Sequence, residues 1–542
     1  MRSNPFVAAM VLALLAGPAF AQQLTAPPLQ LPLQAGRLSA ALRIHVREFR
    51  FEGNTVFTSA ELSRLVEPYT GRDISSEELE EARRVVTLYY VNHGYINSGA
   101  LIPEQDTSEG IITIRIVEGV LSGVRVSGNR WLRESFIEGK LRRWGDTPVN
   151  MDRLREGLQL LRQDPNVSQV NAELKPGALP GQSLLDVRVQ DQNPFRAGIQ
   201  VDNDRPASVG ADEVLFLAGD HNLTGHGDPL DITYGIAEGG NHGFKFSDFN
   251  NESGSYRIPL TAYDTTLRVY GSKNDFAIVE EPVSQTNVRS ESYSAGVTLR
   301  QPFYQTANRE LALAVTFERR YSKSTVSGLP FTGMPGAPDG VNEVSALRIA
   351  QEWVDRNQNQ VVALRSTFSV GLDAFGITDE DPDRNGKFFS WLGQVQYVRR
   401  LFDTPNQIVV HADGQWSPRP LLSLEQFTLG GPDTVRGYRV NQVVSDEGVD
   451  GSIELRLPVV FNARGDAVLQ VAPFIDFGHA WNVDNAPVQP QTIWSAGVGL
   501  LLTPNKHVNA QIYWGHPFRE VATPNTDLQD LGLYFKLNVE GF

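Results

Sequence analysis

The chain contains no cysteine in 542 residues. A disulfide framework and thiolate chemistry are therefore excluded. Basic residues are also in the minority, because 48 lysines and arginines stand against 63 aspartates and glutamates, for a net charge of −15. A nucleic-acid-binding protein usually presents a basic surface, so this balance argues against a nucleic-acid partner.

Long apolar runs are missing as well. Apart from the start of the chain, no apolar stretch approaches the roughly 20 residues that a membrane-spanning helix needs. At the start, Arg2 precedes an apolar run from Phe6 to Leu15, and Ala19-Phe20-Ala21 follows. A basic start, a short apolar core and a small-x-small end are typical of a cleavable secretory signal, which we place at residues 1–21. We therefore expect an exported protein without a transmembrane helix.

A proline- and leucine-rich stretch at residues 22–43 is predicted to be a tether, and a unit that occurs twice follows it. The copies span residues 44–119 and 120–192, and each opens on a strand that ends in a glycine-asparagine turn. Gly128-Asn129 lies 75 positions after Gly53-Asn54. This self-similarity indicates two copies of one supersecondary unit.

Each copy continues with two helices and two strands. Ser75 and Glu78 have the spacing of a capping box at the start of one helix. The predicted helices are Ser59–Tyr69, Ser76–His93, Arg133–Trp144 and Met151–Gln163, and the predicted closing strands are Tyr95–Pro103, Ile111–Val117, Val167–Leu174 and Leu184–Val189. Both copies are therefore β-α-α-β-β units in which helices cover one face of a small sheet, and neither carries a catalytic motif.

After Asn193-Pro194 the hydrophobic period changes to two. In the last segment every second residue is apolar: Leu533, Phe535, Leu537 and Val539. One apolar and one polar face, over segments of about 9–14 residues, are the pattern of a transmembrane β-barrel with lipid outside and water inside.

The connections between these segments alternate between short and long. Short periplasmic turns and longer external loops are typical of a bacterial outer-membrane barrel. The hairpins predict about 16 antiparallel strands across residues 193–542. A soluble β-sandwich is the alternative, but it does not keep this alternation of loop length. The predicted fold is therefore two α+β domains followed by an all-β transmembrane barrel.

Short motifs, in this order, resemble those of one known family. Their residues are Ile102-Pro103-Glu104-Gln105, Asn222-Leu223-x-Gly225-x-Gly227-Asp228, Val435-Arg436-Gly437-Tyr438, Gly451–Pro458 and Phe474-Ile475-Asp476-Phe477-Gly478. The family is that of the two-partner secretion transporters, also called haemolysin secretion/activation proteins, and the resemblance covers the mature chain. It implies that the repeated units are periplasmic POTRA domains and that the barrel lies in the bacterial outer membrane.

The resemblance implies that the protein captures an unfolded partner exoprotein through its POTRA domains and exports it through its barrel to the cell surface. The exoprotein would carry an N-terminal secretion domain, and an adhesin, a haemolysin, a growth inhibitor or a heme-binding protein all fit. Outer-membrane lipids and, during biogenesis, the barrel-assembly machinery are further expected partners. The alternative is an insertase for outer-membrane proteins, but the presence of two POTRA units rather than more favours the transporter. We expect neither enzymatic activity nor a cofactor.

Alternation along the segment Leu469–Gly478 divides its side chains between two faces. Asp476 shares the lumen-facing side with Phe474 and Gly478, and alternation along the preceding strand turns Glu454 toward the lumen as well. Two carboxylates on adjacent strands make a site for one guanidinium group, whose planar fork can bind a carboxylate through two hydrogen bonds.

The resemblance also implies that the sixth long loop, which carries the motif Val435 to Tyr438, folds back into the barrel. We expect Arg436 to bind the two lumen carboxylates there. Gly437 would let the backbone pass close to the wall, and Tyr438 would stack against it.

Capture of an extended partner segment requires a sheet with an open edge, to which a strand can be added. The strand Tyr95–Pro103 is predicted to be that edge. The residues expected to contact the partner are Tyr95, Asn97, Gly99, Leu101 and Pro103.

Two further expectations concern the ends of the chain. Known members of the family often place an N-terminal helix in the pore as a plug, but residues 22–43 span under roughly 75 Å even when fully extended, so we expect no plug. Phe542 resembles the C-terminal aromatic residue that the assembly machinery recognises. A bulge at Gly541 would turn its ring outward.

Two other clusters of side chains resemble metal sites. The first holds three of the nine histidines, His221, His226 and His242; because the first two flank a glycine-rich turn, a structural role is favoured. A group of acidic residues superficially resembles a calcium loop: Asp379, Asp381, Asp383 and Asn385-Gly386. Because no glutamate occupies its twelfth position, a solvated external loop is favoured.

Overall fold

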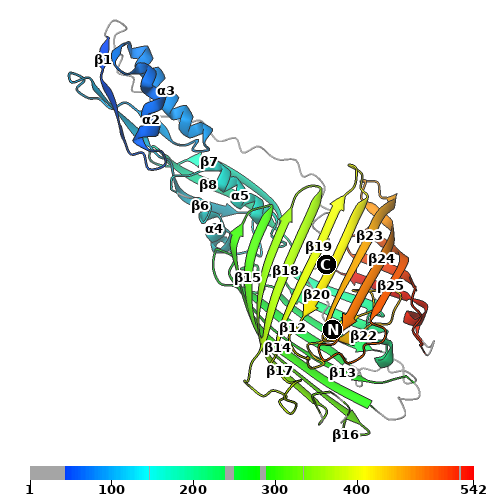
Figure 1. Ribbon diagram of the computed structural model, residues 1–542. Coiled ribbons are helices and arrows are strands. Elements are labelled where there is room, and N and C mark those ends of the chain that lie inside the picture. Colours follow the sequence, from blue (N-terminus) through cyan, green and yellow to red (C-terminus); the bar gives the residue numbers. More distant parts are fainter. Residues whose placement is uncertain are drawn as a thin grey trace. The chain divides into compact units, whose positions relative to one another are not determined.

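The structure is a computed structural model that describes residues 43–541, apart from 146, 238–249, 281–287, 332, 334, 338 and 524–526. The described residues form two compact units that divide between Asn193 and Pro194 (Figure 1). The predicted fold class is confirmed, because α+β domains precede a closed antiparallel barrel. The signal segment, the tether, any N-terminal plug and Phe542 lie outside the described residues.

The first copy of the repeated unit, called the first POTRA domain after the resemblance, contains a three-stranded sheet in the order β2-β5-β4 and a separate pair of strands, β1 and β3. Its elements are β1 (Ile44–Val46), β2 (Glu48–Glu52), α2 (Ser59–Val66), η2 (Glu67–Tyr69), β3 (Arg72–Ile74), α3 (Ser76–Asn92), β4 (Gly99–Leu101) and β5 (Ile111–Val117). The capping box predicted at the start of α3 is present, since the side chain of Ser75 accepts from the Glu78 amide and the Glu78 carboxylate accepts from the Ser75 amide.

The second copy of the repeated unit, called the second POTRA domain after the resemblance, has the same arrangement with the sheet order β6-β8-β7. Its elements are β6 (Val120–Ser127), α4 (Glu134–Arg142), α5 (Met151–Arg162), β7 (Val167–Pro176) and β8 (Gln182–Asp191). In both domains the central strand pairs in parallel with the first strand and antiparallel with the edge strand that precedes it in sequence.

The glycine-asparagine turns are stabilised in the same way in both domains. The Asn54 side chain donates to the Phe57 carbonyl at 2.8 Å, and the Asn129 side chain donates to the Leu132 carbonyl at 2.7 Å. A carboxylate from the end of the central strand then binds the amides after each turn. Glu118 accepts from the amides of Thr55 and Val56, and Asp191 accepts from those of Arg130, Trp131 and Leu132. The repeat predicted from sequence is therefore also a repeat of hydrogen bonds.

The carboxyl group of Glu118 has a perturbed pKa. Burial alone would raise this pKa, but hydrogen bonds from Thr55, Val56 and Tyr90 outweigh burial and hold the pKa below its ordinary value. The ionised form of Glu118 is therefore the one that the folded domain stabilises.

The edge strand of the first domain is shorter than predicted. Instead of Tyr95–Pro103, only Gly99–Leu101 pairs with β5, and Tyr95 to Ser98 form a turn. The cause is a contact between the two POTRA domains, because Asn97 is buried and its Nδ2 donates to Ser183 Oγ at 3.1 Å. The amide of Met151 also donates to the Gly94 carbonyl at 2.9 Å. This turn therefore joins the two domains rather than extending the sheet.

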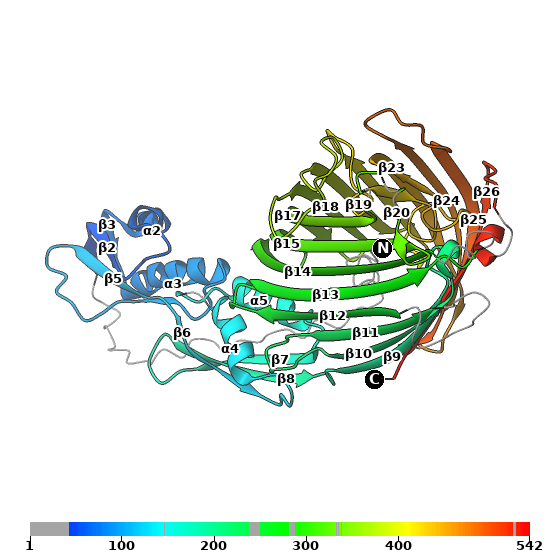
Figure 2. The same cartoon turned by 90° about the horizontal axis from the view of Figure 1, so that it is seen from below.

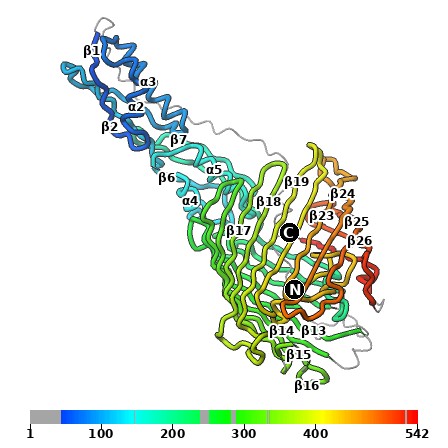
Figure 3. The backbone as a smooth tube through the Cα atoms, viewed as in Figure 1, coloured from blue at the N-terminus to red at the C-terminus, as the bar shows by residue number. Residues whose placement is uncertain are grey.

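Among the described residues, the barrel contains sixteen long antiparallel strands, which pair in sequence order and close through pairing of the last with the first. Figure 2 shows successive strands of this wall lying side by side. The sixteen strands are β9 (Phe195–Asp202), β10 (Glu213–Asp220), β11 (Leu230–Ala237), β12 (Asn250–Pro259), β13 (Thr266–Ala277), β14 (Val288–Gln305), β15 (Arg309–Val326), β17 (Val341–Arg356), β18 (Gln360–Gly371), β19 (Phe389–Arg400), β20 (Gln407–Trp416), β23 (Glu447–Phe461), β24 (Ala467–Trp481), β25 (Thr492–Asn505), β26 (Val508–Pro517) and β27 (Leu533–Glu540). The closing pair runs from Lys536 opposite Asp202 to Glu540 opposite Gly198. Figure 3 shows β17, β18 and β19 running side by side in this wall.

Side chains alternate between the two faces of the wall as predicted. On β24, Ile475 and Phe477 are 49% and 47% exposed, whereas Asp476 between them is 1% exposed. On β23, Ile453 is 47% exposed and Glu454 is 4% exposed. The apolar face therefore points to lipid and the polar face to the lumen. Among the described residues, no helix combines the length and the apolar composition of a membrane-spanning helix.

The carboxylate that caps the second turn provides a test of the POTRA fold. We predict that Asp191→Ala lowers the unfolding free energy of the periplasmic fragment 43–193 by about 1–3 kcal/mol, because three backbone amides lose their acceptor. Urea unfolding followed by circular dichroism measures the change. The control is Glu173→Ala, whose side chain is 65% exposed. Equal unfolding midpoints for the two variants would contradict the assigned role of Asp191.

Candidate functional site

The sixth long loop, residues 417–446, connects β20 to β23 and folds onto the inner face of the barrel. It carries a short hairpin of β21 (Phe427–Leu429) and β22 (Val443–Ser445), which pair antiparallel. The core of this hairpin packs against residues of β24 and β25 and of the loop between them: Phe427, Leu429, Val435, Tyr438 and Val443 lie against Ala480, Val488 and Ile493. Burial of these apolar side chains holds the loop inside the barrel.

Arg436 at the tip of this hairpin binds two lumen carboxylates. Its Nε and Nη2 donate to the two oxygens of Asp476, each at 2.8 Å, and its Nη1 donates to Glu454 at 2.5 Å. The backbone amide of Arg436 also donates to Asp476 at 3.0 Å, and Nη2 donates to Ser452 Oγ at 2.8 Å. Arg436 is 6% exposed, so the ion pairs lie out of contact with bulk solvent.

Two aromatic rings pack against the same guanidinium group. The Arg436 Cζ atom lies 3.5 Å from the centre of the Phe474 ring and 4.8 Å from that of Tyr513. The Tyr513 hydroxyl donates to Glu454 at 3.3 Å, and Arg456 shares the same carboxylate at 2.8 Å. The planar guanidinium group thus has hydrogen-bond acceptors along its edge and packs against aromatic rings. The compact ammonium group of a lysine could not make both kinds of contact.

The residues after Arg436 lie directly on the wall. Gly437 has a φ of +95°, and a Cβ atom there would lie 3.0 Å from the Gly515 carbonyl oxygen. Its amide donates to the Tyr534 hydroxyl at 3.0 Å, and the Tyr438 hydroxyl donates to the Trp494 carbonyl at 3.0 Å. Glycine is therefore required at this position both by backbone conformation and by space.

The wall is shaped to receive the loop. A Cβ atom on Gly478 would lie 2.9 Å from a methyl group of Leu429 and 3.0 Å from one of Val435. The absence of a side chain at Gly478 leaves room for the apolar side of the hairpin. This explains why a glycine follows two residues after Asp476 on the same face of β24.

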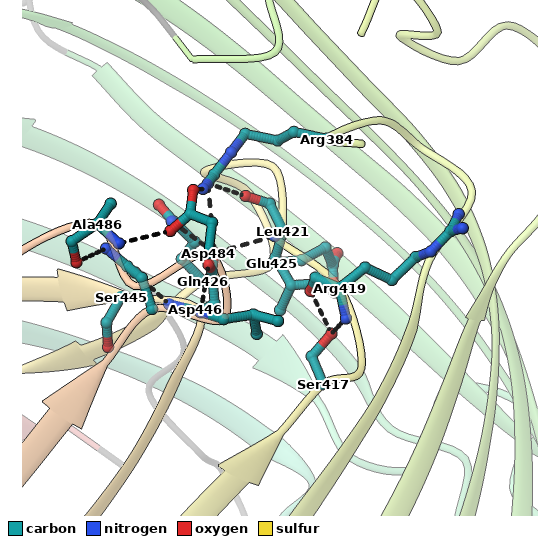
Figure 4. A network of polar contacts seen from close by, with 12 residues as sticks. Arg384, Ser417, Arg419, Leu421, Glu425, Gln426, Ser445, Asp446, Asp484 and Ala486 are labelled. Carbon is teal, nitrogen blue, oxygen red and sulfur yellow. Dashed lines mark hydrogen bonds and ion pairs between the residues drawn. The ribbon is translucent and has the colours of Figure 1, made fainter. Parts of the chain in front are cut away.

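The two ends of the sixth loop are joined to each other and to neighbouring loops by a second polar network around Asp446 (Figure 4). This carboxylate is 0% exposed and accepts from the Leu421 amide at 2.9 Å and from Gln426 at 3.0 Å. Arg384, from the loop between β18 and β19, donates to Asp446 at 3.2 Å and to Asp484, from the loop between β24 and β25, at 3.4 Å. Three external loops are therefore connected through one carboxylate and one guanidinium group.

In the structure, Arg436 contacts Asp476, Glu454 and Phe474. The alternation of side chains along the strands had predicted that these three residues face the lumen. The residues that the sequence analysis missed are Ser452, Tyr513, Tyr534 and Gly515. Ser452 has the same parity as Glu454, so alternation alone could have found it. The others lie on β26 and β27, and their positions depend on the register of strands far along the chain.

The predicted capture edge differs from the structure in two respects. Asn97 contacts the second POTRA domain, and the outward-facing groups of β4 are already occupied. The Ala100 amide donates to Thr87 Oγ1 at 3.0 Å and its carbonyl accepts from Arg83 at 3.2 Å, both from α3. Because neighbouring residues of a strand alternate, the amide of Gly99 faces β5. The first POTRA domain therefore lacks a free edge at β4.

The two alternative clusters hold internal contacts. His221 lies 3.0 Å from Asp231 and His226 lies 3.0 Å from Thr224, while His242 is outside the described residues. Asp379 binds Lys387, and Asp381 accepts from the amide of Asp383. Among the residues described, no group of three or more potential ligands has the arrangement of a metal site.

Comparison with known proteins gives the family. The profile of the haemolysin secretion/activation protein family ShlB/FhaC/HecB matches residues 181–502, and that of the ShlB-type POTRA domain matches residues 44–119. The outer membrane transporter CdiB of Dickeya dadantii (strain 3937) is 23% identical over 521 residues, covering 93% of this chain and 88% of the relative. The heme/hemopexin transporter protein HuxB of Haemophilus influenzae (strain 86-028NP) is 22% identical over 471 residues, covering 82% of this chain and 78% of the relative.

Among solved structures, CdiB from Escherichia coli matches with a TM-score of 0.70 and 22% identity, covering 95% of this chain and 94% of that one. This likeness concerns the fold. Together, the closed barrel, the POTRA match at residues 44–119 and the relatives define an outer-membrane transporter with a periplasmic POTRA domain. Because the family profile spans more than half of the chain, the protein belongs to the haemolysin secretion/activation family. The resemblance predicted from the sequence is confirmed.

The contact between Arg436 and Asp476 is the test of this site. We predict that Arg436→Ala and Asp476→Ala each abolish secretion of the partner protein while the barrel still reaches the outer membrane. Without Arg436 the buried Asp476 carboxylate is left unpaired, at a cost of about 3–5 kcal/mol. Without Asp476 the guanidinium group keeps only the Glu454 carboxylate, so we expect each change to displace the loop. Secretion into the medium and the transporter content of the outer-membrane fraction are measured together.

The control is the exchange Arg436→Asp with Asp476→Arg, which restores the opposite charges and is expected to recover part of the secretion. Near-normal secretion by both single variants would show that the ion pair has no role in transport.

Proposed function

We propose that the protein exports an unfolded partner exoprotein, which its POTRA domains capture in the periplasm and its barrel passes to the cell surface. The observation that carries the proposal is the secretion/activation profile, which runs from residue 181 in the second POTRA domain to residue 502 in the barrel. The insertase alternative is not favoured, because the matching profile is that of secretion proteins. One relative is named for heme/hemopexin transport, so a heme-binding exoprotein is among the candidate partners.

Deletion of the transporter distinguishes these functions. Cells without it are expected to lose the exoprotein from the surface and the medium and to keep their other outer-membrane barrels at normal levels. Immunoblots of the medium and of heat-modifiable barrels in the outer membrane measure both quantities. A general fall in assembled barrels, with the exoprotein still released, would favour the insertase instead.

Capture is proposed to occur by strand addition at β7, the edge strand of the second POTRA sheet. β7 spans ten residues, compared with three for β4. In the part of the chain that the structure describes, the backbone of Gln169 to Lys175 hydrogen-bonds only to β8. An extended partner segment would find free donors and acceptors along this edge.

The register of β7 identifies which amides face the open side. The Gly177 amide donates to the Gln182 carbonyl at 2.8 Å, so the residues of the same parity, Lys175, Glu173 and Asn171, bond to β8. Alternation then turns the amide of Ala172 toward the open edge.

We predict that Ala172→Pro weakens binding of the exoprotein's N-terminal domain to the periplasmic fragment about fivefold, since one hydrogen bond of roughly 1 kcal/mol is lost. Ala172→Ser keeps the amide and serves as the control. Binding is measured by titration calorimetry, with circular dichroism to verify the fold. Unchanged affinity of a folded Ala172→Pro fragment would rule out β7 as the capture edge.

A further inference from the structure

Glu425 lies in the sixth loop ahead of β21, and its carboxylate is bound by two arginines of the barrel wall. Arg348 of β17 donates to Oε1 at 2.7 Å and to Oε2 at 2.9 Å. Arg320 of β15 donates to Oε1 at 3.3 Å and to the Leu424 carbonyl at 2.8 Å. Glu425 and Arg348 are 7% and 8% exposed. The polarity is the reverse of that at Arg436, because here the loop supplies the anion and the wall supplies the cations.

Apolar and neutral contacts hold the same part of the loop, residues 421–425, which we call the loop base. Leu421 and Leu422 are 0% and 1% exposed and pack in one cluster with Val344 and Ala346 of β17. The Asn342 Nδ2 of β17 donates to Ser423 Oγ at 3.0 Å. Leu421 and Glu425 are seen on this segment in Figure 4.

The loop base and the loop tip bind different parts of the wall. The Glu425 carboxylate contacts β15 and β17, whereas the Arg436 side chain contacts β23 and β24, and the strands β18, β19 and β20 lie between β17 and β23. Backbone groups of the base also accept from Arg384 and from Gln415 of β20 and donate to Asp446. Neighbouring strands lie about 4.8 Å apart, so the four steps from β17 to β23 correspond to roughly 19 Å of wall. The loop is therefore attached at two separated places on the lumen surface.

The two attachments differ in whether the charged residues of the wall keep a hydrogen-bond partner once the loop has left. Among the described residues, Arg436 is the hydrogen-bond donor to the Asp476 carboxylate, whose side chain is 0% exposed. Without Arg436, this buried carboxylate would have no donor. Departure of Glu425 leaves Arg348 with Glu318 at 2.9 Å and with Ser369 at 2.9 Å.

Arg320 also keeps a carboxylate, since its Nε lies 3.0 Å from Glu318. The two wall arginines therefore share the Glu318 carboxylate after the loop base has left, whereas the Asp476 carboxylate would keep no hydrogen-bond donor among the described residues. Removing one member of a buried pair is most costly when the other is left with no partner at all. The base is consequently the attachment that can open, and the tip is the one that stays.

We propose that Glu425 is a positioning residue for export: it holds the loop base against β15 and β17, and the base releases there while Arg436 stays bound. The exoprotein passes through the space that the loop base vacates. This inference rests on the export function proposed above.

A cysteine pair tests whether the base must move, and the chain has no natural cysteine to interfere. Asn342→Cys with Ser423→Cys replaces the two side chains that are hydrogen-bonded at 3.0 Å. With the disulfide formed, as measured by thiol alkylation, secretion of the exoprotein is expected to stop, and a reductant is expected to restore it. Wild-type secretion by the fully oxidised pair would overturn the proposal.

The matched control is Ser290→Cys with Ser324→Cys. These residues are directly opposed on β14 and β15, and their hydroxyl oxygens lie 3.0 Å apart. Their disulfide joins two neighbouring strands without touching the loop, so secretion is expected to continue in the oxidised form. A block by this pair as well would assign the effect to stiffening of the wall and contradict release of the loop.

A second measurement needs no exoprotein and no disulfide. Glu425→Gln keeps the size of the side chain but removes its charge, so the fraction of time that the purified channel spends open in a planar bilayer is expected to rise several-fold. Glu352→Gln is the control. Glu352 is also a buried lumen carboxylate, but its partner at 2.8 Å is Arg300 of β14, another strand of the barrel, and not a residue of the loop.

Equal open fractions for Glu425→Gln, Glu352→Gln and the wild type would overturn the role of Glu425. If Glu425→Gln opens the channel but the wild-type protein secretes no exoprotein in cells, the loop attachment stands and the export function fails. The two experiments therefore separate the failure of this inference from the failure of the proposed function.

Discussion

The sixth loop is held inside the barrel by one guanidinium group that lies between two carboxylates of the wall. Arg436 forms a bidentate ion pair with Asp476 and a further hydrogen bond to Glu454, and all three residues are buried. A sixteen-stranded barrel is wide enough to enclose an aqueous channel. The position of this loop therefore decides how much of the lumen is open. The glycines of β24 and β26 leave room for this loop, because a Cβ atom on Gly478 would meet Leu429 and Val435, and one on Gly515 would meet the backbone of Arg436 and Gly437.

Inside the lumen, charges of opposite sign meet across elements that are distant in sequence. Asp446 and Arg384 link the sixth loop to two neighbouring loops, and Arg439 binds Asp530 ahead of β27 at 2.5 Å. Such pairs are screened less than surface pairs, which contribute only about 0–1 kcal/mol. Their main effect is geometric, because each pair fixes where a long loop can lie. The sixth loop is thereby connected to the described segments that carry Arg384, Asp484 and Asp530.

Much of the fold could be predicted from local patterns. The period of two defined the barrel, the Gly53-Asn54 and Gly128-Asn129 turns defined the POTRA repeat, and alternation on β23 and β24 placed Glu454 and Asp476 in the lumen. These features depend on residues close together in sequence. The contact between Arg436 and the carboxylates became predictable only with the family resemblance, which implied that the loop folds inward.

Other parts of the site could not be predicted, for physical reasons. Glu425 and Arg348 are 77 positions apart, and their contact depends on the path of a long loop and on the register of β17. The turn at Asn97 interrupts an otherwise strand-like segment, because its amide side chain reaches Ser183 in the other domain. An isolated segment carries no signal for a partner 86 positions away.

The side chains of Thr87 and Arg83 that cover the edge of β4 have a consequence for the protein in the crowded periplasm. Exposed sheet edges pair readily with other chains, and proteins avoid aggregation by blocking them. In the first POTRA domain, α3 provides this protection through two hydrogen bonds to Ala100. In the described part of the chain, no backbone bond of Gln169 to Lys175 on β7 goes to anything but β8, so this longer edge of the second domain lacks the protection that β4 has. Selection against misassembly would act most strongly on the residues along β7.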